Sequence, residues 1–524
     1  MSKISSKLKK TGLALTTTAL LLALCLTPGL AADKPKLGGT ITVGLNTDLT
    51  AVDPHTSVAV VNAIVLHHVF EPLLAYGEDL KLMPVACERW EANKDYTAYI
   101  FHLRKHKLFH NGREMVAEDV KFSLERVMDP KISPRAKHFI GVAGVEVKDK
   151  YTVVVKLKKP FAAFPHLLAY INPVIAVVPK EELAKQGGVF KERPSGTGPY
   201  MFAEWKPDRY IILKKFGKYT GPTGPRNGLG GERIAYLDTI KLVPIPEESV
   251  SLMALLNKEI DLLQYFPPKY VEKHKKDYAK KGLVLNEVPG LSWYQIYFGV
   301  NRPVTKNLKF RQACAYAIDL DKATQAAYLG HAKSNPSVIT RGSVYRTPYH
   351  DTWYKYDPVK AKQLLKESGY KGEPVILDTT KKYIAMFRQA VAVQAALQAI
   401  GVNVKLNVVE WPVLLKKCVN GDFQMLSYGA GGTPNPALAY AYLKRGGFEG
   451  AYPEIKKIKE AALMTDDLQQ LRSLYEKAHR ITYEQVPWIQ LYNYNYLQAH
   501  WNYVKGYKTI NTGYPILWGV WLDK

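Results

Sequence analysis

The sequence holds few cysteines, and their spacing builds neither a disulfide framework nor a zinc site. Four are present, at Cys25, Cys87, Cys314 and Cys418, and no Cys-x-x-Cys pair occurs. Cys25 lies in an N-terminal leader, so three remain for the folded chain and at most one disulfide can form. We therefore interpret these three as small hydrophobic residues buried in cores.

Motifs of catalysis are absent as well. The sequence contains no Gly-x-Ser-x-Gly, no His-Glu-x-x-His and no phosphate-binding loop. His67 and His68 stand in an apolar stretch typical of a packed helix, and His102, His106 and His110 have no carboxylate or Cys in a ligand register. No pattern singles out the paired acids of a glycosidase. We expect no enzyme, no metal and no cofactor, with a secreted hydrolase as the alternative.

Long hydrophobic runs are missing, apart from one stretch near the start. Residues 1–11 carry four Lys and no acid, Gly12–Leu26 is apolar, and Gly29–Ala32 supplies small residues for cleavage. This pattern is typical of a secretory signal peptide and is shorter than a membrane span. We expect cleavage near Ala32 to leave a soluble chain of 492 residues in the periplasm.

Cys25 raises the alternative of a lipid anchor. A lipid-attachment site takes a small residue before the Cys, and here that residue is Leu24. We favour a cleaved signal peptide over a lipoprotein.

Acidic residues are scarce relative to basic ones. Lys and Arg number 72 and Asp and Glu 47, and loss of the leader lowers the net charge from +25 to +21. The basic residues spread from Lys34 to Lys524, whereas nucleic-acid binding gathers them on one face or helix, so we expect no nucleic-acid partner. An anionic membrane surface and an anionic ligand are two interpretations of the charge. We favour a third, a solvated surface without a partner.

Strand-like and helix-like segments alternate along the rest of the chain. Gly39–Leu45 has the pattern of a strand, Ile384–Ile400 that of an amphipathic helix, and Asp357–Glu367 that of a helix capped by Asp357. Further strands are predicted at Tyr99–Leu103, Tyr151–Leu157, Thr239–Val243, Asp261–Gln264, Val375–Asp378, Val402–Val409 and Asn493–Gln498, and further helices at Val58–Phe70, Val116–Val127, Pro246–Leu256, Phe310–Tyr316 and Gln470–Thr482. The alternation in two halves predicts two α/β lobes.

A stiff turn followed by a hairpin occupies Pro194–Phe216, PSGTGPYMFAEWKPDRYIILKKF. Gly196–Pro199 has the chemistry of a tight turn, because Pro fixes φ and Gly adopts backbone angles that other residues avoid. Tyr200–Trp205 and Tyr210–Phe216 alternate as two strands. Lys206–Arg209 joins them with Pro at the second position, which predicts a type I turn.

Longer motifs follow one another in a fixed order over nearly the whole chain after the leader. They are Gly39–Val43, Ala51–His55 and Phe70–Leu74; Trp90, Tyr99–Arg104, Phe109–Gly112 and Ala117–Ser123; Gly196–Tyr200; Arg311–Asp319; Asp357–Ala361, Leu364–Leu365 and Gly369–Tyr370; and Trp411 with Gly421–Phe423. The set resembles the family 5 extracellular solute-binding proteins, the binding components of peptide- and nickel-type ABC importers.

The resemblance implies an α/β, two-lobed periplasmic binding protein fold of type II that closes about a hinge, with an extra α/β domain. It implies this division of the chain: signal peptide 1–32, lobe I 33–62, extra domain 63–193, lobe I again 194–288, lobe II 289–490, and a return to lobe I at 491–524. The turn at Gly196–Pro199 then marks the re-entry into lobe I.

The resemblance also implies a function. The chain would bind a peptide or peptide-like solute between its lobes, as a monomer, and deliver it to an ABC transporter permease and ATPase. The alternatives are a non-peptide solute, namely an opine-like acid, an oligosaccharide, a nickel chelate or haem.

The loop after Gly421–Phe423 departs from the family's peptide binders. They carry an acid there for the peptide α-amino group, whereas residues 427–436 hold no acid, and the acid's place falls near Thr433. The family's aromatic is missing at Ala430, and Cys418 and Ser427 stand where some oligopeptide binders have Arg. A buried ammonium needs a countercharge. The glycines instead let backbone N–H groups approach anionic or carbonyl oxygens.

Ten residues are expected at the cleft, because loops at strand ends line the crevice of α/β folds. Trp411 matches a cleft aromatic of the family, and core packing is the alternative for it and for any single Tyr. The ten are Asn46, Thr47, Asp48, Trp411, Ser427, Tyr428, Gly429, Thr433, Tyr492 and Tyr494.

Overall fold

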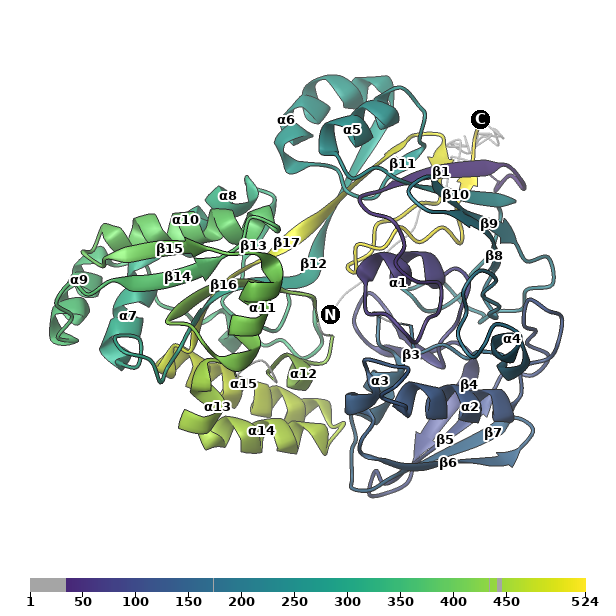
Figure 1. Cartoon of the computed structure of the whole chain (residues 1–524), viewed down its shortest axis with the longest axis horizontal. Helices are drawn as coiled ribbons and strands as arrows, with labels where there is room; N and C mark the ends of the chain where they lie inside the picture. The colour runs from purple at the N-terminus through teal and green to yellow at the C-terminus, as the bar shows by residue number, and fades with distance from the viewer. Residues whose placement is uncertain (1–33, 173, 433, 441–444) are drawn as a thin grey trace, which may run out of the picture. The chain divides into compact units, whose positions relative to one another are not determined.

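The computed structural model describes residues 34–524, except residues 173, 433 and 441–444. The predicted signal peptide and Cys25 lie outside these described residues. Residues 36–524 form one compact unit in which strands and helices alternate (Figure 1). The predicted α/β class is therefore confirmed.

One sheet of 11 strands runs through this unit. Its order is β15-β14-β16-β12-β17-β11-β1-β10-β9-β8, and β13 pairs with β17 off this path. The strands are β1 Thr40–Leu45, β8 Tyr200–Lys206, β9 Tyr210–Lys215, β10 Thr239–Pro244, β11 Leu262–Leu263, β12 Leu283–Phe298, β13 Ala332–Ser334, β14 Val375–Thr379, β15 Val404–Val408, β16 Met425–Ala430 and β17 Trp488–Trp501.

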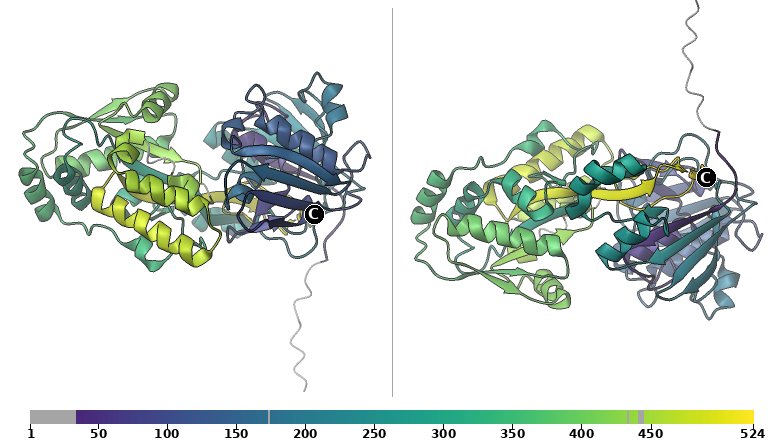
Figure 2. Two further views of the ribbon diagram at one scale, coloured as in Figure 1. Left: turned by 90° about the horizontal axis from the view of Figure 1, so that it is seen from below. Right: turned by 90° about the horizontal axis from the view of Figure 1, so that it is seen from above.

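Two long antiparallel strands, β12 and β17, join the halves of this sheet. β12 has 16 residues and β17 has 14. At one end β17 pairs with β11, and at the other β12 pairs with β16. We call the half that contains β1 and β8–β11 the first lobe, and the half that contains β14–β16 the second lobe. In the right view of Figure 2, the yellow β17 extends from the green second lobe toward the first.

The first lobe is built around β1, which lies parallel between β10 and β11. Ile41, Val43 and Leu45 of β1 are fully buried, as the alternation of the sequence predicts. The predicted hairpin is confirmed as β8 and β9, and β9 pairs with β10. Two short helices follow in this lobe, α5 Glu248–Leu256 and α6 Val271–Lys273.

The turn of this hairpin differs from the prediction. Asp208 has φ of +60°, and Arg209 N donates to the carbonyl of Lys206. A positive φ at the third residue is the mark of a type II turn, so the prediction of type I is wrong. Asp48 explains the difference, because its carboxylate accepts the Asp208 N–H at 2.7 Å and the Trp205 indole N–H at 3.1 Å.

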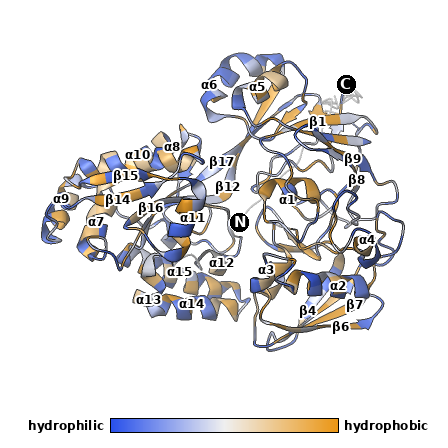
Figure 3. Ribbon diagram, viewed as in Figure 1, coloured by the Kyte–Doolittle hydropathy of each residue, from blue (hydrophilic) through white to orange (hydrophobic). Residues whose placement is uncertain are grey.

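An α/β insert separates the first strand of the first lobe from its hairpin. Its four-stranded antiparallel sheet has the order β4-β5-β7-β6. Its elements, with the short strands and helices beside it, are α1 Val60–Leu66, β2 Leu74–Tyr76, β3 Leu82–Pro84, β4 Cys87–Ala92, β5 Ala98–Leu103, α2 Ala117–Met128, β6 Val142–Asp149, β7 Thr152–Leu157, α3 Phe164–Leu168 and α4 Lys180–Ala184. Six of the seven residues of α1 are buried, and Figure 3 shows this helix as hydrophobic. The helix predicted at Val58–Phe70 is therefore shorter than expected and is a core helix.

The second lobe places three parallel strands, β14, β15 and β16, among helices. The helices are α7 Leu308–Ala317, α8 Leu320–Tyr328, α9 Pro358–Glu367, α10 Ile384–Gln398, α11 Trp411–Asn420, α12 Pro436–Tyr440, α13 Phe448–Ala451, α14 Pro453–Leu463 and α15 Leu468–Gln485. The predicted Asp357 cap is confirmed, since its carboxylate accepts the Lys360 N–H at 2.8 Å. The chain ends in β18 Val504–Lys505 and β19 Trp521–Leu522.

The Gly-Thr-Gly turn lies directly against the backbone that follows α1. A Cβ on Gly196 would stand 2.1 Å from the carbonyl oxygen of Val69, and one on Gly198 would stand 2.5 Å from that of His68. Gly198 N also donates to Val69 O at 2.9 Å. The glycines are required because two stretches of main chain approach too closely for any side chain.

A buried charge cluster anchors this turn. Thr197 Oγ1 donates to Glu71 Oε2 at 2.9 Å, and Lys107 Nζ lies 2.5 Å from the same oxygen. Arg233 lies 3.5 Å from the other carboxylate oxygen. Burial would raise the pKa of Glu71, but Lys107 and Arg233 outweigh it and hold that pKa below its ordinary value. The ionised Glu71 therefore binds the turn to the insert.

We expect Gly196→Ala to destabilise the protein by about 3 kcal/mol, because the added methyl group meets a backbone oxygen that cannot move aside. Gly144→Ala is the matched control, since a Cβ on Gly144 meets nothing within 4 Å. The midpoint of urea unfolding measures both. Equal midpoints for the two variants would contradict the close approach.

Six histidines whose pKa burial lowers strongly make stability depend on pH. Burial lowers the pKa of His67 to about 3 and that of His55, His68, His110, His166 and His479 to about 4. Their ordinary value of 6.5 applies to the unfolded chain, so below that pH the unfolded state binds more protons. Stability is therefore complete above pH 6.5 and is lost as the pH falls toward 4.

We expect the free energy of unfolding to fall by about 8 kcal/mol per pH unit near pH 5, about 1.4 kcal/mol for each of the six histidines. Urea unfolding at pH 7, 6 and 5 measures the slope. His479→Asn should reduce the slope by about a sixth, whereas replacement of His106, whose side chain is 87% exposed, by Asn should leave it unchanged. A midpoint that stays constant from pH 7 to 5 would refute this account.

Candidate functional site

The carboxyl ends of the parallel strands β14, β15 and β16 meet at one edge of the second lobe. Tyr383 is the N-cap residue of α10 after β14, and Trp411 is the first residue of α11 after β15. The rings of Tyr383 and Trp411 lie 4.8 Å apart, edge to face, and Trp411 stacks on Tyr428 of β16 at 5.9 Å. This edge is where α/β folds bind ligands. Two of the predicted site residues, Trp411 and Tyr428, therefore contact each other there.

A cluster of tyrosines lies beside this edge, on β12, β17 and their neighbours. Tyr294 stacks on Tyr492 with ring centroids 5.0 Å apart and an interplanar angle of 3°. Tyr494 lies 5.5 Å from Tyr294 and 5.3 Å from Tyr328 of α8, and Tyr265 of the first lobe lies beside Tyr328 and Tyr494. We call these five residues the tyrosine cluster. The structure thus joins the predicted Tyr492 and Tyr494 to three tyrosines that the sequence did not single out.

Ser427 and Gly429 lie on the opposite face of β16 from Tyr428. Ser427 is fully buried, donates to Met386 O at 2.6 Å and accepts from Gln389 Nε2 at 2.8 Å. A Cβ on Gly429 would stand 2.6 Å from the ring of Tyr294. Ser427 therefore holds α10 on the sheet, and Gly429 leaves room for Tyr294.

The three predicted residues after β1 have contacts within the first lobe. Asp48 holds the hairpin turn, as described above. Asn46 N lies 3.5 Å from Gln264 Oε1, and the side chains of Asn46 and Thr47 are exposed. Thr433 lies outside the described residues.

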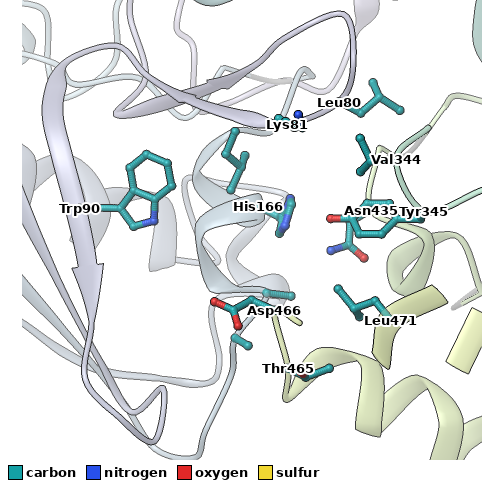
Figure 4. Close-up of a pocket in the computed structure, with 13 residues that line it drawn as sticks. Leu80, Lys81, Trp90, His166, Val344, Tyr345, Asn435, Thr465, Asp466 and Leu471 are labelled. Carbon is teal, nitrogen blue, oxygen red and sulfur yellow. The ribbon is translucent and has the colours of Figure 1, made fainter. Parts of the chain in front are cut away.

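A cavity of about 250 Å³ lies between the insert and the second lobe (Figure 4). Its lining is Leu80, Lys81, Leu82, Trp90, Ala162, Ala163, His166, Val344, Tyr345, Asn435, Thr465, Asp466 and Leu471. Tyr96 donates to Asp466 at 2.5 Å, and Ala163 N donates to Leu463 O at 3.3 Å. These two bonds tie the insert to the second lobe beside the cavity. No sequence pattern predicted this cavity, because its walls come from segments far apart in the chain.

Within residues 34–524, apart from the gaps given above, no three His, Cys, Asp or Glu side chains gather as a metal site requires. Among the same residues no helix is long and apolar enough to cross a membrane.

The hydroxyl of Tyr492 is buried and has no hydrogen-bond partner in the described part of the chain. Burial raises the pKa of this phenol, so the hydroxyl keeps its proton. A neutral hydroxyl can donate a hydrogen bond to an incoming group or accept one from it. We expect Tyr492→Phe to raise the free energy of unfolding by about 1 kcal/mol, because it removes an unpaired polar atom.

Urea unfolding of the unliganded protein measures this change. Tyr99→Phe is the control, since the Tyr99 hydroxyl donates to Phe161 O at 2.9 Å and its removal should destabilise. Destabilisation by Tyr492→Phe would show that the hydroxyl already has a partner.

The known proteins that this chain resembles are solute-binding proteins. Residues 81–451 match the family model of the bacterial extracellular solute-binding proteins, family 5 Middle. The glutathione-binding protein GsiB of Salmonella choleraesuis is 27% identical over 504 residues, covering 93% of this chain and 95% of its own. The periplasmic binding protein DppA of Helicobacter pylori, solved with the peptide STSA, is 27% identical with a TM-score of 0.75 and covers 93% and 99%. The substrate-binding protein CtaP of Listeria monocytogenes has a TM-score of 0.81 at 23% identity, covers 93% and 100%, and shows the same fold.

Proposed function

Because this chain belongs to the bacterial extracellular solute-binding proteins of family 5, we propose that it captures a peptide or peptide-like solute between its two lobes and delivers it to a membrane permease. Members of this family are the solute-binding components of ABC importers. Its relatives are binding proteins, and we infer that this chain likewise performs no catalysis. A separate ATPase supplies the energy, and the protein works as a monomer outside the cytoplasm.

One observation carries the proposal. The aromatic edge of the second lobe, formed by Tyr383, Trp411 and Tyr428, lies next to the tyrosine cluster on the two strands that both lobes share. Aromatic side chains offer large apolar surfaces, and tyrosine adds a polar tip. Such a surface suits a solute with mixed side chains and few fixed charges.

Peptides are favoured over other solutes by the relatives. DppA of Helicobacter pylori was solved with a peptide, and GsiB is named for glutathione, itself a small peptide. The acid-free loop at residues 427–436 sets this chain apart from peptide binders that pair an acid with the α-amino group. We therefore propose a peptide-like solute whose amino end is not held by that loop.

Closure about β12 and β17 would bury the solute. A permease would then recognise the closed form and distinguish it from the open form. A dissociation constant near 1 µM, about −8 kcal/mol, is sufficient for capture.

The test is a thermal-shift screen of the purified protein with dipeptides, oligopeptides, N-blocked peptides, opine-like acids, oligosaccharides and nickel chelates. A ligand at 100 times its Kd stabilises the native state by about 2.7 kcal/mol, so a peptide of the right kind should raise Tm clearly. Trp411→Ala should reduce that shift.

Tyr356→Ala serves as the control, because Tyr356 is 51% exposed and lies before α9, away from the aromatic edge. Its shift should equal that of the unmodified protein. Absence of a shift with every compound would overturn the proposed function.

A further inference from the structure

Exposed lysines are concentrated in one segment of the first lobe, Lys269–Lys281, which we call the basic segment. Its 13 residues hold six Lys and two acids, whereas the whole chain after loss of the leader has a net charge of +21 over 492 residues. The segment contains α6, one turn of π-helix at His274–Tyr278 and one 3-10 turn at Ala279–Lys281. Its density of positive charge is therefore several times the average of the chain.

One side of the basic segment is fixed in the core. Val271, His274 and Tyr278 are buried at helical spacing. His274 Nε2 donates to the carbonyl of Leu283, the first residue of β12, at 2.9 Å, and its ring meets Phe266 edge to face at 5.8 Å. Figure 1 shows α6 at the end of the first lobe away from the insert, and Figure 3 shows it as hydrophilic. The lysines therefore stand on a rigid support.

Few acids balance these lysines. Lys275 pairs with Glu272 at 2.8 Å, and Lys269 pairs with Glu248 of α5 at 3.0 Å. The other lysines of the segment have neither a hydrogen bond nor an ion pair with any residue in the described part of the chain; they are Lys273, Lys276, Lys280 and Lys281. Asp277 is the remaining acid of the segment, so most of this positive charge stays uncompensated.

An extended array of negative charges fits this surface better than a single anion or a protein. A small ligand needs polar groups that converge in a concavity, whereas these lysines are exposed along a helical surface and none of them lines the cavity described above. Protein interfaces are poor in Lys and gather aromatic and Arg side chains. The exposed residues of the basic segment are Lys, acids and Ala279. Anionic headgroups of a bilayer attract such a cluster of Lys through their surface potential.

We propose that the basic segment docks this protein on the anionic phospholipid headgroups of a membrane. This inference goes beyond the proposed function and does not depend on which solute is bound. It assigns a location to the membrane interpretation of the net charge, whereas the sequence alone favoured a solvated surface without a partner. Docking would hold a chain with a cleaved leader near the membrane that contains its permease, and this consequence alone rests on the proposed function.

The experiment measures co-sedimentation of the purified protein, without the predicted leader, with vesicles of phosphatidylcholine that contain about 30% phosphatidylglycerol. We expect binding at about 0.05 M salt, loss of most binding at about 0.5 M salt because charges are screened, and no binding to pure phosphatidylcholine. The triple variant Lys276→Gln, Lys280→Gln, Lys281→Gln should lower the partition coefficient about 100-fold, because each Lys near an anionic surface contributes roughly a factor of five.

A second triple variant, Lys355→Gln, Lys362→Gln, Lys366→Gln, is the matched control. It removes the same charge from exposed positions in and just before α9 of the second lobe, and it should bind vesicles nearly as well as the unmodified protein. Both variants replace exposed side chains, so Tm should not change. The solute screen should give the same Tm shifts with the first variant as with the unmodified protein, which separates this inference from the proposed function.

An equal loss of vesicle binding in the two triple variants would overturn the inference, because net charge rather than the basic segment would then attract the lipid. Failure of the unmodified protein to bind anionic vesicles at low salt would overturn it as well. Binding to polyglutamate that is as tight as binding to the vesicles would indicate an acidic protein partner instead of a membrane. Each of these results leaves solute capture intact, because the thermal-shift screen tests it separately.

Discussion

The hydrogen-bonded ladder between β12 and β17 is the interaction on which the rest of the structure depends. It runs from the pair Leu283 and Trp501 to the pair Tyr297 and Trp488, so the same backbone hydrogen bonds connect both lobes. Leu291 of β12 packs in the core of the first lobe, whereas Ile296 packs in that of the second. A connection of this kind resists separation of the lobes far better than a flexible loop, and it places the tyrosine cluster on strands that both lobes share.

Buried charges that have partners hold the scaffold together. Asp53 and Arg126 form a bidentate pair at 2.7 and 2.9 Å, and Asp53 also accepts the Phe190 N–H at 3.0 Å. Glu71 is fixed by Lys107 and Arg233 in the same manner. Removal of one partner from such a group leaves an uncompensated buried charge.

Local signals made much of the fold predictable, and long-range pairing made the rest unpredictable. The Asp357 cap and the hairpin at Tyr200–Lys215 depend on neighbours in sequence, so both were foreseen. β12 was not, because Pro289 and Gly290 interrupt its pattern and only β17 completes it. Of the site, Trp411, Tyr428, Tyr492 and Tyr494 were expected. Tyr265, Tyr294 and Tyr328 come from three separate segments that meet only in the folded chain, and Asp48 was expected at the cleft but binds the hairpin turn.

The ladder slips its register twice, between Pro289 and Trp293 and again between Tyr294 and Gln295. A sheet bends most easily where its register is broken, so the ladder is expected to bend at these two breaks. Tyr294 stands at these breaks and also forms the centre of the tyrosine cluster. A solute that displaced this ring would therefore act where the ladder bends, and a small bend there would displace the far ends of both lobes by a larger distance.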